Sequence, residues 1–67
     1  MIFDKSAQPL LEQYRSACEE DVRSVRTLLA ALAAGTEDVE PLVTRMEQTR
    51  ARVMDIWDQL QAHALGK

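Results

Sequence analysis

Residues 28–41 read LLAALAAGTEDVEP, and this stretch decides the fold. A run of leucine and alanine ends at Gly35, and three acidic residues and Pro41 follow within the next six positions. Glycine readily takes the left-handed backbone conformation that ends a helix, whereas acidic residues and proline are favoured in the first turn of a helix. The stretch therefore predicts the end of one helix and the beginning of a second.

The apolar residues on both sides of this stretch recur at spacings of three and four, which is the spacing of one face of an α-helix. On the N-terminal side the predicted stripe is Leu11, Tyr14, Cys18, Val22, Val25, Leu29 and Leu32. On the C-terminal side it is Val39, Val43, Met46, Arg50, Val53, Trp57, Leu60 and Ala64, with one charged member. No segment alternates with a period of two, so we expect no strands.

Capping residues set the bounds of the two helices. Asp4 or Ser6 can cap the first helix, with Pro9 in its first turn, and Asp38 can cap the second, which Gly66 can end. We expect a single domain over residues 1–67, with a helix at about 7–34, a turn at 35–38 and a helix at about 39–65.

A turn this short predicts that the two helices run antiparallel, as an all-α two-helix hairpin. Folding about residues 36–37 brings together residues whose numbers sum to about 73. Tyr14 is then expected near Trp57, and Asp21 near Arg50. We predict that Asp21 and Arg50 form an ion pair in the middle of the hairpin, where such a pair can fix the register of the helices.

The size of the chain indicates that the hairpin is completed by another chain. It has 67 residues and one cysteine, so it forms no intrachain disulfide. Below roughly 70–80 residues a single core rarely supplies more than about 3–5 kcal/mol. The apolar arcs are also wider than one neighbouring helix requires, which favours a four-helix-bundle-like assembly formed by dimerisation or with a partner protein. The predicted partner-binding residues are Leu42, Met46, Val53, Ile56, Trp57 and Leu60.

Charge and hydropathy exclude other classes of function. The net charge is −3 and neither half of the chain carries a basic face, so no nucleic-acid binding is expected. The longest apolar run, residues 28–34, is far shorter than the roughly 20 residues that span a bilayer. A lone cysteine fits a reducing compartment, and MIFDKSAQP lacks the pattern of a signal peptide. We therefore expect a cytoplasmic protein.

No residue pattern predicts a catalytic, cofactor or metal site. His63 has no acidic residue three or four positions away, and Cys18 lies on the apolar stripe, where core packing is expected. Small all-helical chorismate mutases bind a dicarboxylate between helices with arginine, lysine, glutamate and glutamine, and Arg50 with Gln48 or Glu47 imitates part of that set. The chain has two helices and no interior lysine, so we expect no enzyme.

The hairpin segment LLAALAAGTEDVEPLVTRMEQTRARVMDIWDQL resembles the small co-chaperones of type III secretion. The resemblance covers about residues 9–62 and rests on length, helix–glycine–helix layout and hydrophobic spacing. It implies a two-helix hairpin that binds a tetratricopeptide-like chaperone and helps to keep the needle subunit soluble before export.

These observations together predict a non-enzymatic protein-binding module, an adaptor or co-chaperone for a secretion substrate or its chaperone. The alternative is a self-assembling homodimeric helical bundle. A small-ligand enzyme formed at a dimer interface is the third and most distant alternative.

Overall fold

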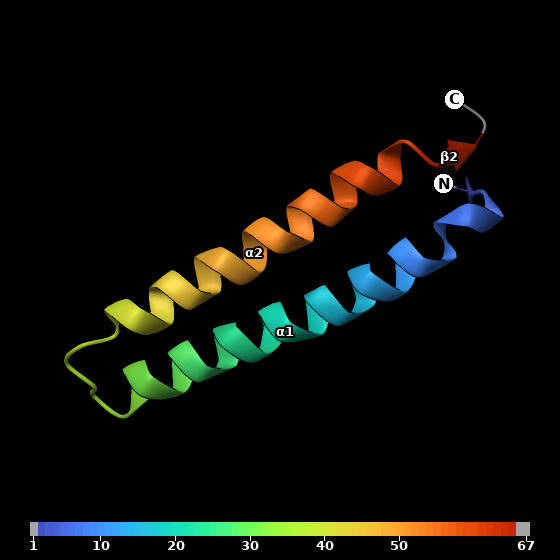
Figure 1. The fold of residues 1–67 in the computed structure, drawn as a ribbon. Coiled ribbons are helices and arrows are strands. Elements are labelled where there is room, and N and C mark those ends of the chain that lie inside the picture. The colour runs from blue at the N-terminus through green and yellow to red at the C-terminus, as the bar shows by residue number, and fades with distance from the viewer. Residues whose placement is uncertain (1, 66–67) are drawn as a thin grey trace.

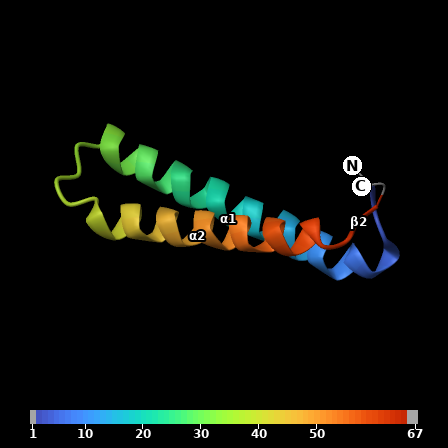
Figure 2. The ribbon, with the colours of Figure 1, turned by 90° about the horizontal axis from the view of Figure 1, so that it is seen from above.

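Two antiparallel helices joined by a short turn form the molecule, and both chain ends lie at the end of the hairpin opposite the turn (Figure 1). The computed structural model describes residues 2–65 and measures 48 × 17 × 13 Å. The helices cross at a shallow angle in the view from above (Figure 2). The elements are β1 (Ile2–Phe3), the 3₁₀ helix η1 (Lys5–Ala7), α1 (Gln8–Ala33), α2 (Glu40–Gln61) and β2 (Ala64–Leu65). The prediction of an all-α hairpin is confirmed.

The turn ends α1 as the sequence predicts. Gly35 has a φ of 75°, its N–H donates to the Leu32 carbonyl (3.1 Å), and the Thr36 N–H donates to the Ala31 carbonyl (3.0 Å). These two bonds are the Schellman motif, which satisfies carbonyls that the helix end would otherwise leave free. On the far side of the turn the Asp38 carboxylate accepts a hydrogen bond from the Glu40 N–H (3.2 Å) at the start of α2.

The N-terminal cap differs from the prediction. Ala7 precedes α1, and neither Asp4 nor Ser6 caps that helix with its side chain. The Asp4 carbonyl instead accepts from the Ala7 N–H (3.1 Å) and so closes the 3₁₀ turn η1. Pro9 lies in the first turn of α1, as predicted, where its missing N–H removes no helix bond.

The C-terminal end also differs from the prediction, because α2 ends at Gln61 and not near residue 65. Residues Ala64–Leu65 form the short strand β2, which pairs antiparallel with β1. The Asp4 N–H donates to the His63 carbonyl (3.1 Å), so the backbone joins both chain ends. The prediction of no strands is therefore wrong at the chain ends, because strands of two residues are too short to show a period of two.

The helices meet along one strip of side chains on each helix, which we call the seam. Every seam position is buried or half-buried, and the positions follow strict spacings of three and four. The seam consists of Ala7, Leu10, Tyr14, Ala17, Asp21, Ser24, Leu28 and Ala31 on one side and of Val39, Leu42, Met46, Thr49, Val53, Ile56, Leu60 and His63 on the other. Its buried apolar core, Ala7, Ala17, Ile56 and Leu60, lies in the half nearer the chain ends.

The seam on α1 is shifted by one column from the predicted apolar stripe. Ala17 and Ser24 are buried at the contact, whereas Cys18 is only half-buried beside it and Val22 is exposed. On α2, Thr49 takes the seam position that the prediction gave to Arg50. The fully buried positions of the α1 seam, Ala17 and Ser24, carry small side chains, which permit close approach of the two helices.

Replacing Gly35 tests the turn. A Cβ at Gly35 meets no atom within 4 Å, so Gly35→Ala introduces backbone strain without a clash. We expect Gly35→Ala to lower the free energy of unfolding in urea by about 1–2 kcal/mol. Gly35→Asn is the matched control and should cost less, because asparagine tolerates the left-handed region. Equal stability of Gly35→Ala and the unaltered chain would contradict the assignment.

Candidate protein-binding surface

One side of the hairpin carries a second apolar strip, which we call the outer apolar face. Successive residues of a helix are rotated by about 100°, so Glu20 and Val22 lie on opposite sides of the seam position Asp21. Glu20 pairs with Arg52 on one side of the seam (2.8 Å). Residues that directly follow a seam residue, as Val22 follows Asp21, therefore lie on the opposite side of the seam on both helices. The apolar residues on this side are Leu11, Cys18, Val22, Val25, Leu29 and Leu32 of α1 and Val43, Met54 and Trp57 of α2, and the charged residues Arg15, Glu40, Glu47 and Arg50 lie in the same columns.

The outer apolar face is most exposed along α1 in the half nearer the turn. Val22, Leu29 and Leu32 expose 49%, 59% and 53% of their surface, and Met54 of α2 exposes 58%. From Cys18 onward, the apolar stripe that the sequence predicted for the first helix coincides with the outer apolar face. Exposed apolar side chains that recur at helical spacing are a feature of helix-packing surfaces.

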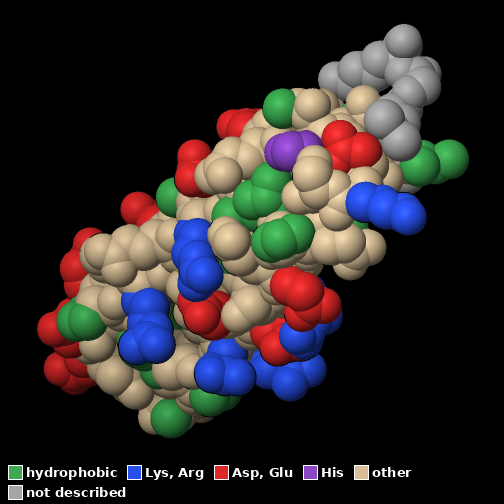
Figure 3. Space-filling model, turned by 45° about the vertical axis from the view of Figure 1, so that its right-hand side comes forward, with side chains coloured by type: hydrophobic (Ala, Val, Ile, Leu, Met, Phe, Trp, Pro, Cys, Tyr) green, Lys and Arg blue, Asp and Glu red, His purple; other side chains and the backbone are tan. Residues whose placement is uncertain are grey.

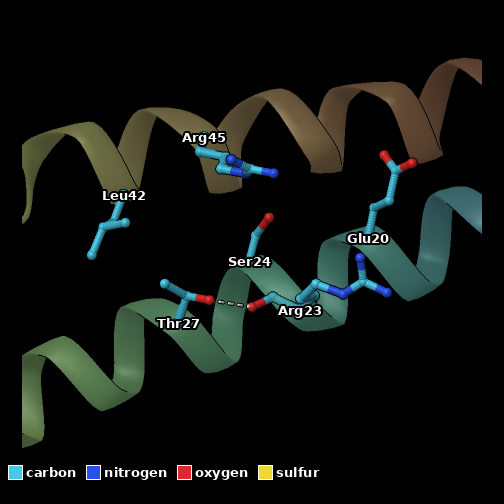
Figure 4. Close-up of a pocket in the computed structure, with 6 residues that line it drawn as sticks. All are labelled: Glu20, Arg23, Ser24, Thr27, Leu42 and Arg45. Carbon is cyan, nitrogen blue, oxygen red and sulfur yellow. Dashed lines mark hydrogen bonds between the residues drawn. The ribbon is translucent and has the colours of Figure 1, made fainter.

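The opposite side of the hairpin is polar. A groove of about 210 Å³ lies between the helices there, lined by Glu20, Arg23, Ser24, Thr27, Leu42 and Arg45. Ser24 points across it toward α2 and Leu42 points back toward α1 (Figure 4). In Figure 3 basic side chains lie mainly in the lower half of the face in view, with acidic side chains among them, and further acidic side chains follow its left edge. The two sides of the seam thus differ in polarity.

The predicted partner-binding residues lie mainly in the seam. Ile56 (4% exposed) and Leu60 (0%) are core residues, so a partner would reach them only if the helices separated. Val53 packs against this core, and Leu42 and Met46 are half-buried seam residues. Of the predicted set, Trp57 alone belongs to the outer apolar face. The prediction combined core and surface residues in one set. The apolar pattern of α2 does not show which row of residues α1 covers and which neighbouring row stays exposed.

Trp57 is partly covered by aromatic side chains of its own chain. The Phe3 ring meets it edge-on at 6.5 Å between centroids, and the Tyr14 ring lies tilted at 5.6 Å. The predicted proximity of Tyr14 and Trp57 is confirmed. Burial raises the pKa of the Tyr14 hydroxyl, and the neighbouring Cys18 thiol raises it further. This end of the outer apolar face is therefore better covered within the chain than the end near the turn.

The predicted ion pair between Asp21 and Arg50 is confirmed. Arg50 Nε lies 3.6 Å from Asp21 Oδ2, and the Thr49 hydroxyl lies 2.9 Å from Asp21 Oδ1, to which it can donate. The Asp21 side chain is 20% exposed and that of Arg50 is 61% exposed. Arg50 thus reaches the seam from the surface and does not line the inward polar pocket that the enzyme alternative requires.

A polar cluster that the sequence did not indicate joins the chain ends. Ser6 Oγ and Asp4 Oδ1 lie 3.1 Å and 3.4 Å from the same nitrogen, His63 Nδ1, and Ser6 also donates to Asp4. A catalytic triad places serine and carboxylate on different nitrogens of the imidazole, so this cluster does not have triad geometry. The Ser6 hydrogen bond, followed by the charge of His63, lowers the pKa of Asp4. No local pattern indicates this contact, because Asp4 and His63 lie at opposite ends of the chain.

Residues 2–65 contain neither a cluster of metal ligands nor a membrane-spanning helix. No group of three histidine, cysteine, aspartate or glutamate side chains in this range has the arrangement of a metal site. Neither helix is both long enough and apolar enough to cross a membrane.

Reversing the charges of the central ion pair tests its contribution to stability. We expect Asp21→Arg to lower the free energy of unfolding, and Arg50→Glu in the same chain to restore roughly 0.5 kcal/mol of the loss, since one partner is largely exposed. Urea unfolding of the two single variants and the double variant measures the coupling. Asp21→Arg with Arg45→Glu is the control, because Arg45 lies on the other side of the seam. The same restoration in the control would refute the pairing.

The contacts at the chain ends predict a dependence of stability on pH. The pKa of Asp4 is lower in the folded chain than in the unfolded chain, so its contribution to stability is present above the unfolded value of about 3.9 and is lost as the pH falls through the lower folded value. Acid unfolding followed by circular dichroism should show a smaller loss of stability below pH 4 for Asp4→Asn than for the unaltered chain. Asp58→Asn, an exposed change on α2, is the control. Identical acid profiles for all three chains would exclude a role for Asp4.

Comparisons of this chain with protein-family models, with curated proteins and with solved structures found no match.

Proposed function

We propose that this chain is a non-enzymatic protein-binding module whose outer apolar face packs against another protein chain. The observation that carries the proposal is the row of exposed apolar side chains on α1, Val22, Leu29 and Leu32, together with Met54 on α2. These residues share one side of the seam, whereas the other side carries the Glu20–Arg52 ion pair and the polar groove. Binding is therefore expected on one side of the hairpin.

The mechanism that we propose is the burial of apolar surface, with no covalent chemistry. A helix laid along the outer apolar face would contact side chains on successive turns of α1, which is how amphipathic helices recognise grooves and each other. Met54 suits such a contact because its unbranched side chain adapts to different neighbours. Trp57 extends the surface toward the chain ends, where Phe3 and Tyr14 already hold its ring in place.

A narrower form of the proposal is a cytoplasmic adaptor or co-chaperone. The support for it is the length of the chain, the helix–Gly35–helix layout and the single free thiol, Cys18, which fits a reducing compartment. In this form the outer apolar face binds a secretion substrate or its chaperone and keeps apolar surface of both proteins away from water.

Site-specific photo-cross-linking in living cells tests the proposal. A photoreactive amino acid placed at position 22 or 29, on the outer apolar face, should give protein–protein cross-links. The same amino acid at position 30 or 48, on exposed positions of the polar side, is the matched control and should give few. Cross-links of equal yield from both sides, or none from positions 22 and 29, would contradict a binding surface on this side.

A further inference from the structure

We propose that the chain covering the outer apolar face is a second copy of this chain, packed face to face so that each α1 lies against the α2 of the other copy. The inference rests on the proposed protein-binding function and names its partner; it replaces the adaptor form, in which a different protein covers the same face. Two hairpins related by a two-fold axis along their length would then form an antiparallel four-helix bundle, with the two turns at the same end. Because one face serves both copies, the interface is self-complementary.

The surface area of the single chain supports a dimer. Its accessible surface is 4992 Å² for a mass of 7.6 kDa. A compact monomer of this mass exposes roughly 4,300 Å². The surplus of about 700 Å² per chain is close to the roughly 800 Å² that each partner buries in a standard stable interface. A rod of 48 × 17 × 13 Å carries this surplus, and laying a second rod along it removes the surplus without a change of fold.

The burial pattern locates this surplus in the half of α1 nearer the turn. The buried apolar residues Ala7, Ala17, Ile56 and Leu60 all lie toward the chain ends. Cys18, Val22, Val25, Leu29 and Leu32 follow spacings of four and three, and of these Val22, Leu29 and Leu32 are exposed. A repeat of this kind fits the side-chain rows of another helix, and a second copy of the hairpin presents a helix of matching length.

Charge selects the orientation of the two copies. On the outer side of α2, Glu40 and Glu47 form an acidic row beside the outer apolar face, in the same column as Arg50, which pairs with Asp21. Asp55 lies on the polar side of the seam with Arg45 and Arg52. On the outer side of α1, Arg26 makes no ion pair with the residues that the structure describes. Placing α2 against a second α2 would bring acidic rows together, which is unfavourable.

The opposite orientation, α1 against the second α2, places opposite charges at the same level of the bundle. Within one hairpin, contacts such as Asp21–Arg50 and Tyr14–Trp57 pair residues whose numbers sum to about 71. A two-fold axis along the hairpin keeps both copies at the same level, so residues of different copies whose numbers sum to about 71 also lie at the same level of the bundle. Arg26 then lies within about one helical turn of Glu47 of the second copy, and Leu29 lies near the level of its Val43.

Sedimentation equilibrium of the full chain, measured over a range of concentrations, tests the inference. We expect a species of twice the 7.6 kDa chain mass that dissociates on dilution. The double change Val22→Gln with Leu29→Gln should raise the dimer dissociation constant at least about thirtyfold. Thr27→Gln with Ala30→Gln, two exposed residues on the polar side of α1, is the matched control and should leave the constant unchanged.

A charge swap tests the orientation without altering the apolar face. Arg26→Glu should weaken the dimer several-fold, and Glu47→Arg in the same chain should restore it, since the double variant recreates both contacts in reverse. Additive weakening by the two changes would overturn the arrangement of α1 against the second α2. Circular dichroism of each variant shows whether the hairpin itself is intact.

The outcomes separate this inference from the proposed function. A folded monomer at every concentration, with cross-links from position 29 to a different protein, would overturn the dimer while leaving the protein-binding role in place. A folded monomer without cross-links from positions 22 and 29 would overturn both. A dimer insensitive to Val22→Gln with Leu29→Gln would place the contact elsewhere and overturn the inference.

Discussion

The close contact between α1 and α2 at small side chains is the constraint on which the rest of the structure depends. Ala17 and Ser24 are buried where the helices meet, and Ala7 fills the same role near the chain ends. A bulky residue at these positions would push the helix axes apart and open the seam along its whole length. With Ala17, Asp21, Ser24 and Leu28 on the inward column of α1, Val22, Leu29 and Leu32 lie outside it. The close packing and the exposed apolar face therefore have the same cause.

The chain ends determine where along the rod the core lies. The pairing of β1 with β2, the Asp4–His63 backbone bond and the contacts of His63 with Ser6 and Asp4 hold the two ends together. Phe3 then covers Trp57 from this end, and Ile56 and Leu60 become buried between the helices. At the other end Gly35 closes the chain through backbone hydrogen bonds alone, without a cluster of large side chains. The rod thus has a well-packed end and a sparsely packed end.

Local signals predicted the features that depend on few residues. The left-handed Gly35, the position of Pro41 and the pairing of Asp21 with Arg50 follow from backbone preference, hydrogen-bond chemistry and turn length. Hydrophobic periodicity was insufficient to place the seam, because it ranks residues by hydropathy and the contact also includes the polar residues Asp21, Ser24 and Thr49. It favoured Cys18 and Arg50 where the structure has Ala17 and Thr49.

The same limit explains why the predicted binding residues lie mainly in the seam. Ile56 and Leu60 are as apolar as an interface requires, but only the rotation of α2 against α1 shows that they are already covered. Leu29 and Leu32 belonged to the stripe assigned to the inside of the hairpin, and the structure leaves them exposed. The contact of Asp4 with His63 joins residues separated by nearly the whole chain, so no pattern in sequence indicates it.

The difference between the two sides of the seam also limits the kind of assembly that the hairpin can build. On the polar side, burial would remove the paired charges of Glu20 and Arg52, and the arginines that line the groove, from water at a cost. On the outer apolar side, burial of the apolar side chains has little such cost, whereas Arg50, which is 61% exposed and pairs with Asp21, carries the same kind of cost. A protein with a single binding surface forms a closed dimer when that surface binds a second copy, because no other surface remains to build a larger oligomer. Arg50 and Arg52 pair with α1 from opposite sides of the seam, and both pairs help to fix the register of the hairpin.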